Sequence, residues 1–328
     1  VEPEKKDIGA FSIGFQLNTI ALKDVDLRFD DDSLLHAHLQ WKKLEAKMQE
    51  MDLDTRRIGL KLLELTDAGV EVRIPGAPQV VKGFDPGHIR MDGLNFKLND
   101  IAYNPDTLAA ELVAMSFREQ SGFRLNHLSM AVVLKSQELS IQDFYLRTPH
   151  TRIQNSTELA FDSLGQLASE LSQVRIKTRF TRTLIGLRDV LFFQPGLQAG
   201  NGITLPPVAG VALEFEGTTD RFRASVELES RLAGFKAKAG MQSIDPDNLR
   251  GELQLNDLYF RSDSLNVALE SVQVKADVEN AQKSIQMQLP FAGMVLQGNY
   301  WVTKLGNVVY NLRVKYFKRS NSRYLREG

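Results

Sequence analysis

Hydrophobic and polar residues alternate strictly along most of this chain, which is the pattern of half-buried antiparallel strands with one solvated face. Clear runs extend from Val25 to Asp30, Val70 to Ile74, Leu94 to Leu98, Val226 to Glu229 and Leu312 to Tyr316. Turn-forming sequences such as Asn104-Pro105-Asp106 separate these runs. The alternation therefore predicts a mainly β protein in which one hairpin follows another.

A six-residue phrase, apolar-x-Asp-apolar-x-apolar, interrupts this alternation six times, where chance would give roughly one match. The matches begin at Leu22, Leu65, Leu98, Ile141, Leu187 and Leu255. Residues three apart in a regular strand point to opposite faces, yet both are apolar here. A β-bulge at the aspartate resolves the conflict, because one extra residue bends the strand and returns both apolar groups to one side. We expect the carboxylates of Asp24, Asp100, Asp143 and Asp257 to accept bonds from the backbone N–H groups that such bulges leave unpaired.

Repeated bulged strands with one continuous apolar face predict a long antiparallel sheet curled into a U-shaped apolar groove, a β-taco. The alternative is a sandwich, in which the same side chains would be divided between two opposed sheets. The predicted groove residues belong to runs whose alternate members are charged or amide: Val25, Leu27, Phe29, Val70, Val72, Ile74, Leu94, Phe96, Leu98, Val226, Leu228, Leu253 and Leu255.

Two stretches interrupt the strand pattern with apolar residues at helical spacing. Leu159 to Val174 predicts a short helix near 161–172. A second is predicted over 184–193, with Thr181 or Thr183 as its N-cap and Pro195-Gly196 as its stop. The phrase that begins at Leu187 is therefore interpreted as a coincidence.

The loop that follows, Gln198-Ala199-Gly200-Asn201-Gly202 with Pro206-Pro207, favours a soft boundary near residue 200. Residues 1–200 are then one segment of the groove with the two short helices, and residues 201–328 continue it as antiparallel hairpins.

Composition narrows the classes of function. The 328 residues carry a formal net charge of −1, which argues against a nucleic-acid partner and against a polybasic membrane clamp. Hydrophobic residues make up 43% of the chain, enough for a large buried surface. The chain has no cysteine, which excludes disulfides, a cysteine nucleophile and thiolate metal ligands, and leaves the compartment open.

The amino-terminal residues, Val1 to Asp7, are charged rather than signal-like, and the chain does not begin with methionine. No window holds the ~18 uncharged apolar residues of a transmembrane helix. We interpret the chain as a processed or excised piece whose export signal or membrane anchor has been left out. The alternative is a complete soluble protein that lacks its initiator.

No motif for catalysis is found, and we expect neither enzymatic activity nor a metal or cofactor. His36 and His38 stand two apart on a probable strand, and the pattern around them supplies no third ligand. Asp30-Asp31-Asp32 is typical of a solvated hairpin turn rather than a calcium site. The basic tail from Lys315 to Arg326 fits either contact with phospholipid headgroups or a strand edge protected by charge.

Several phrases resemble a known family. Leu22-Lys-Asp-Val-Asp-Leu-Arg-Phe and Ile141-Gln-Asp-Phe-Tyr-Leu-Arg-Thr-Pro-His-Thr-Arg-Ile are similar to sequences of the AsmA-like superfamily. Phe117-Arg-Glu-Gln-Ser-Gly-Phe-Arg-Leu and Asp189-Val-Leu-Phe-Phe-Gln-Pro-Gly-Leu resemble a diverged TamB translocation and assembly module. The resemblance covers roughly residues 10–200; beyond them it lies mainly in the strand pattern and in the run from Leu312 to Asn321.

This resemblance implies a periplasmic protein, anchored in the inner membrane of a diderm bacterium, whose groove carries phospholipid toward the outer membrane. It also implies an outer-membrane barrel protein of the BamA/TamA type as a partner, because family members are tied to the assembly of such barrels. The chain departs from the family pattern by lacking the amino-terminal transmembrane helix and by being much shorter than whole members.

The residues themselves favour binding without catalysis, because an apolar floor offers acyl chains a continuous path. A rival interpretation is a scaffold whose open sheet edge pairs with unfolded barrel strands by β-augmentation. A third, an adhesin-like or sugar-binding β protein, would need aromatic or carboxylate clusters that the sequence does not show.

Overall fold

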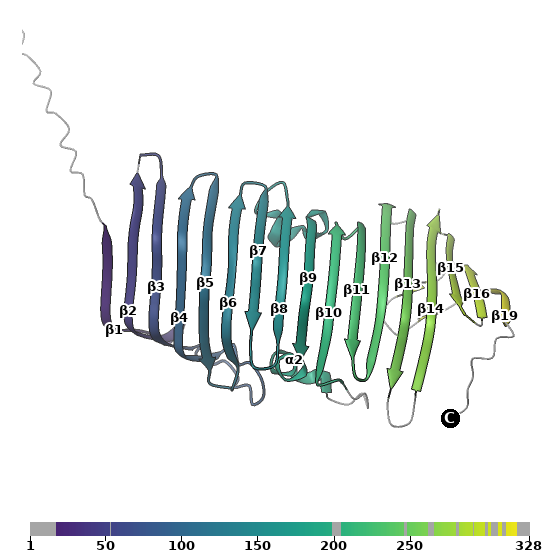
Figure 1. Ribbon diagram of the computed structural model, residues 1–328, viewed down its shortest axis with the longest axis horizontal. Coiled ribbons are helices and arrows are strands. Elements are labelled where there is room, and N and C mark those ends of the chain that lie inside the picture. Colours follow the sequence, from purple (N-terminus) through teal and green to yellow (C-terminus); the bar gives the residue numbers. More distant parts are fainter. Residues whose placement is uncertain are drawn as a thin grey trace, which may run out of the picture.

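The structure is a computed structural model that describes residues 18–52, 54–198, 205–245, 248–261, 266–279, 282–290, 292–298, 301–302, 308–309 and 313–319. Its main feature is one 17-stranded antiparallel sheet (Figure 1). Each strand pairs with the next along the chain, from β1 to β16, and β16 then pairs with β19. The two short strands β17 and β18 pair only with each other.

The strands are β1 (Thr19–Asp31), β2 (Leu35–Asp52), β3 (Arg57–Arg73), β4 (His88–Asn104), β5 (Thr107–Glu119), β6 (Arg124–Lys135), β7 (Glu138–Arg147), β8 (Arg152–Ala160), β9 (Arg175–Gly186), β10 (Val208–Gly217), β11 (Arg221–Ser230), β12 (Ala233–Asp245), β13 (Asn248–Arg261), β14 (Asn266–Glu279), β15 (Gln282–Leu289), β16 (Ala292–Gly298), β17 (Trp301–Val302), β18 (Val308–Val309) and β19 (Arg313–Arg319). The helical elements are α1 (Gln166–Ser169), η1 (Leu171–Gln173), α2 (Leu187–Phe193) and η2 (Pro195–Gln198).

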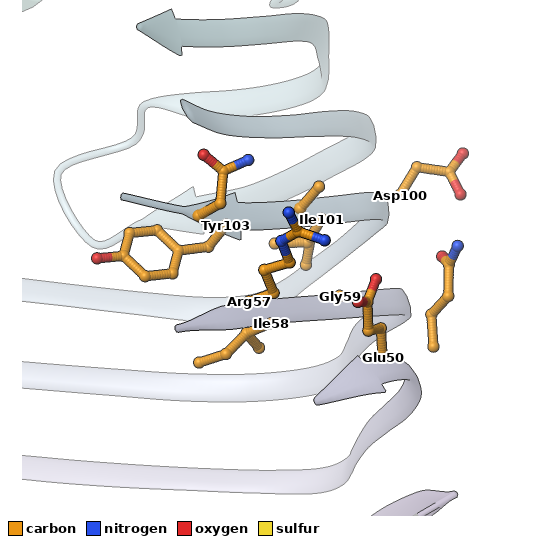
Figure 2. A pocket seen from close by; sticks show the side chains of 10 residues that line it. Glu50, Arg57, Ile58, Gly59, Asp100, Ile101 and Tyr103 are labelled. Carbon is orange, nitrogen blue, oxygen red and sulfur yellow. The ribbon is translucent and has the colours of Figure 1, made fainter. Parts of the chain in front are cut away.

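The predicted fold class is confirmed: the protein is mainly β, and its sheet curls into a U instead of forming a sandwich. Figure 2 shows the ribbons bending round and returning, with Asp100 on the outer side of a bend. The apolar side chains line the inner face of the U, so "inner face" and "outer face" are used below in this sense.

Five of the six phrase aspartates have the positive φ angle that marks a backbone irregularity, between +49° and +53°: Asp24, Asp67, Asp100, Asp143 and Asp257. The strand register shifts beside Asp100 against β5, beside Asp143 against β6 and β8, and beside Asp257 against β12. At Asp24 the register with β2 is unbroken, so any bulge there faces the open edge of β1. The sixth match lies in α2, in agreement with its interpretation as a coincidence.

The predicted role of the carboxylates is wrong. Within the described residues, none of Asp24, Asp100, Asp143 and Asp257 accepts a hydrogen bond from a backbone N–H, and Asp257 instead pairs with Lys236 at 3.2 Å. The aspartates are there because a short polar residue tolerates the left-handed region, where a β-branched side chain clashes with the backbone. Arg182 adopts the same conformation, with φ of 49°, and shifts the register between β9 and β10.

Both predicted helices are shorter than expected. Leu159 and Ala160 end β8, so the first helical turn is confined to α1 and η1. β9 continues to Gly186, which is the N-cap residue of α2, and the prediction of Thr181 or Thr183 as the cap is therefore wrong. Pro195 does end α2, although the chain continues as η2.

The sheet runs unbroken across the predicted soft boundary, because β9 pairs with β10 from Gly186 opposite Val208 to Ile176 opposite Gly217. Most of the loop that suggested the boundary, residues 199–204, lies outside the described residues.

Candidate functional site

The predicted groove residues of the first four strands form continuous cross-strand rows, because directly paired residues point to the same face of a sheet. Leu27 on β1 continues through Leu39 and Val70 to Met91 on β4. The other rows run Phe29–Ala37–Val72–Ile89, Val25–Trp41–Ala68–Leu94 and Phe96–Met115–Leu128–Leu146–Ile153. Ile74 lies just beyond β3, at the rim, and is exposed.

The predicted residues of the second half lie on the same face. Val226 pairs with Leu213 on one side and Ala237 on the other, and Ala237 pairs with Leu255. Parallel rows are Val211–Leu228–Phe235 and Phe215–Ala224–Ala239–Leu253–Val274–Met287. Strands lie about 4.8 Å apart, so an inner face that crosses 17 strands is about 75 Å long.

No second layer of structure covers this face among the described residues. In the part of the chain that the structure describes, only eight apolar side chains are buried, and Phe161 and Val174 among them lie outside the strands: Ala68, Leu94, Leu112, Leu125, Phe161, Val174, Ala237 and Val272. Most groove residues are half-buried by their neighbours alone, and Leu27 and Phe29 on the edge strand are about half exposed, at 51% and 52%. A large apolar surface that faces solvent in this way is typical of a binding surface.

The outer face is polar and carries ion pairs between neighbouring strands. Lys42 bonds to the carboxylate of Asp67, and Asp24 lies on its other side, so that both raise the pKa of the Lys42 ammonium. His38 lies 3.0 Å from Asp26 and holds the pKa of that carboxyl below its usual range. His36 similarly pairs with Asp30, at 3.0 Å. The two histidines thus act as separate surface pairs with carboxylates.

The inner face contains a polar interruption, which we call the polar seam: Asn155 and Thr157 on β8 with Thr178 on β9. Thr157 Oγ1 donates to Asn155 Oδ1 at 2.8 Å, and Asn155 Nδ2 donates to Thr178 Oγ1 at 2.9 Å. The two hydroxyl oxygens lie 2.7 Å apart. All three side chains are half-buried. The polar seam was missed in the sequence because β-branched threonine fits a strand as well as valine does.

An aromatic cluster of Phe84, Phe117, Phe123, Phe192 and Phe193 covers part of one rim. Phe123 stacks on Phe192 with ring centroids 5.2 Å apart, and its ring meets that of Phe193 edge-on at 5.3 Å. The backbone N–H of Phe84 donates to the carbonyl of Phe192 at 2.9 Å. Because Phe117 lies opposite Leu125 on the inner face, this cluster contacts the inner face at β5 and β6.

Helix α2 reaches this cluster because it is docked on the turn between β7 and β8, at the lower ends of the strands in Figure 1. Thr148 Oγ1 donates to the carboxylate of Asp189 in α2, and Thr151 Oγ1 accepts from the N–H of Gly186 at 3.0 Å. Two phrases that carry the family resemblance, around Thr148 and from Asp189, therefore contact each other.

We expect Gly186→Ala to loosen this docking. A Cβ atom at Gly186 would lie 2.5 Å from the Cβ and 2.6 Å from the carbonyl oxygen of His150. The strain should lower the free energy of unfolding by about 1–3 kcal/mol, measured by urea denaturation. Gly196→Ala is the control, because nothing lies within 4 Å of its added Cβ. Equal stability of the two variants would show that the close approach at Gly186 does not hold α2.

The loop between β3 and β4, which carries Phe84, is organised by Asp85. Its carboxylate accepts from the N–H groups of Val80 and Gly87, both at 3.0 Å, and from His88 at 3.1 Å. The bond from Val80 makes the largest contribution to lowering the pKa of Asp85. The carboxylate therefore stays ionised, and holds Phe84 beside α2, down to acidic pH.

A shallow pocket of about 230 Å³ lies at the other ends of β3 and β4 (Figure 2). Ile58, Ile101 and Tyr103 contribute apolar surface to it, while Glu50 and Arg57 supply charge at its border. The sequence-based list of groove residues did not include these three. The phrase itself could have found Ile101 and Tyr103, because it places them beyond the bulge on the face of Leu98.

Within the described ranges, no group of three or more His, Cys, Asp and Glu side chains could hold a metal ion. The same part of the chain contains no helix long and apolar enough to span a membrane. Comparisons with protein-family models, with curated proteins and with solved structures found no match. The resemblance to the TamB and AsmA-like proteins therefore stays a prediction from the sequence phrases.

Proposed function

We propose that this protein is a non-enzymatic conduit that binds phospholipid along its apolar groove and moves it between the inner and outer membranes. The observation that carries the proposal is the uncovered inner face, whose apolar rows cross successive strands on both sides of the polar seam in a sheet about 75 Å long. That length exceeds the ~30 Å hydrocarbon core of a bilayer, so the groove could shield acyl chains over a distance that membranes do not bridge.

Energetics support acyl chains as the occupant. Each CH₂ group that leaves water for an apolar surface contributes about 0.8 kcal/mol, and the inner face offers similar surroundings from strand to strand. An acyl chain that moves along this face keeps most of its apolar surface buried at every position. The charged outer face, in contrast, gains nothing from contact with lipid. The groove therefore favours movement along its axis without any chemical step.

Location and partners follow from the same proposal. A conduit between two membranes works in the periplasm, and the proposed protein would be held there by attachment to the inner membrane. At the far end the receiving partner would be the outer membrane, either directly or through a barrel protein of the BamA/TamA type.

The proposal is tested by native mass spectrometry of the protein purified from membranes with mild detergent. We expect species heavier than the protein by one or more phospholipid masses, which disappear when the lipid is extracted with organic solvent. A spectrum that contains only the bare protein, under conditions that preserve lipid adducts of a known lipid-binding control, would overturn the conduit.

A second candidate function, a scaffold that pairs with barrel strands, is favoured by the edge strand β1. Within the described residues β1 pairs only with β2, and Ile20, Leu22, Leu27 and Phe29 on it are exposed. However, Asp24 interrupts this strand with a positive φ angle, and backbone irregularities and charges are features that protect edges from pairing. The edge therefore supports the scaffold less than the inner face supports the conduit.

A further inference from the structure

The polar seam lies inside an otherwise apolar surface, and its neighbours show how abrupt the change is. Thr157 pairs with Ile141 on β7, and Asn155 pairs with Phe144 on the same strand. On the other side Thr178 pairs with Phe215 on β10. A lipid that moves along the groove therefore meets three polar side chains between two apolar sections.

The hydrogen bonds within the polar seam use all of its donors. Asn155 Nδ2 donates to Thr178 Oγ1 at 2.9 Å and to the carbonyl of Arg179 at 3.2 Å. Thr157 donates to Asn155 Oδ1, and the hydroxyl of Thr178 can donate to Thr157 Oγ1, at 2.7 Å, or to the carbonyl of Ser156, at 3.3 Å. An amide nitrogen has two hydrogens and a hydroxyl has one, so no donor is left.

Acceptor capacity remains, because each of these oxygens has two lone pairs. Asn155 Oδ1 and Thr178 Oγ1 each accept one bond within the network and Thr157 Oγ1 accepts at most one, so each oxygen keeps at least one lone pair. The three side chains are half-buried rather than enclosed, so a ligand can reach them. The polar seam is therefore selective for groups that donate hydrogen bonds, such as ammonium and hydroxyl groups.

We propose that the polar seam is a binding site for amphiphiles whose headgroup carries a hydrogen-bond donor. This rests on the proposed function and adds a preference to it. Phosphatidylethanolamine has an ammonium group with N–H donors, whereas phosphatidylcholine has the same phosphate and glycerol but a fully methylated nitrogen. The protein should accordingly retain the first lipid more strongly than the second.

The test uses the whole 328-residue chain and vesicles of equimolar dioleoyl-phosphatidylethanolamine and dioleoyl-phosphatidylcholine. After incubation the protein is separated from the vesicles, and the lipid bound to it is quantified by mass spectrometry. The wild-type protein should hold about three- to tenfold more phosphatidylethanolamine, the range expected for one or a few added hydrogen bonds. The ratio should fall to near one in the triple variant Asn155→Leu, Thr157→Val, Thr178→Val.

Two control variants separate the role of the seam from a loss of structure. Thr157→Ser with Thr178→Ser keeps the oxygens and should keep the preference, while Ser140→Ala on the outer face of β7 should change nothing. Equal retention of both lipids by the wild type, or an unchanged preference in a folded triple variant, would overturn the seam as the binding site. Retention of neither lipid would instead overturn the conduit itself.

Discussion

Leu228→Arg is expected to reduce phospholipid binding at least tenfold, whereas Glu227→Arg, one residue away, should leave it unchanged. Leu228 lies on the inner face between Val211 and Phe235, so an arginine there places a charge where acyl chains would pass. Lipid binding would remove the arginine from water, and this desolvation makes the free energy of binding less favourable by several kcal/mol. Glu227 points to the outer face and is exposed.

Phe96→Glu and Lys97→Glu form a second matched pair in the first half of the groove. Both variants should keep the sheet, because the backbone ladder between β3, β4 and β5 does not depend on these side chains. Circular dichroism checks the fold, and mass spectrometry of co-purified lipid measures the effect. Equal lipid content in the inner-face and outer-face variants would mean that lipid does not occupy the inner face.

The second large effect is expected at the bulges. Replacing Asp100, Asp143 and Asp257 together by valine should lower the free energy of unfolding by about 3–6 kcal/mol, because each site has a positive φ angle that costs a β-branched residue roughly 1–2 kcal/mol. Straightening of these strands should also open the U. Urea denaturation measures the first effect, and small-angle X-ray scattering measures the second.

A glycine series at the same three positions identifies the cause. Glycine removes the carboxylate but adopts positive φ freely. The glycine variant should therefore be more stable than a variant with alanine at the same three positions. A variant with asparagine there should be about as stable as wild type. If glycine were as damaging as alanine, the carboxylates rather than the backbone would hold the bulges. The absence of bonds from these carboxylates to backbone N–H groups favours the backbone.

Sequence periodicity was sufficient to predict the fold class and the inner face, because both depend on which residues alternate. Leu27 on β1 and Leu255 on β13 lie on the face that their charged neighbours indicated, although eleven strands separate them. The position of the bulges was also predictable, since Asp at a break in the alternation is a local signal. The bulge at Arg182 could not be predicted, because a long charged residue in a strand is not a local signal for a bulge.

Contacts between segments far apart in the sequence could not be predicted from the pattern of apolar and polar residues. The docking of α2 depends on Thr148 and Asp189, which lie 41 residues apart. The polar seam likewise requires the register between β8 and β9, which brings Thr157 opposite Thr178. In the sequence both threonines fit the strand pattern as ordinary β-branched residues, and only their pairing across strands makes them a polar group.

The central claim, that lipid lies on the inner face, is tested most directly by photo-crosslinking in cells. A benzophenone amino acid is placed at Phe215 on the inner face or at its neighbour Glu216 on the outer face, and adducts are isolated from membranes after irradiation. The account predicts phospholipid adducts at position 215 and few or none at position 216. Equal labelling at the two positions, or labelling at 216 alone, would contradict it.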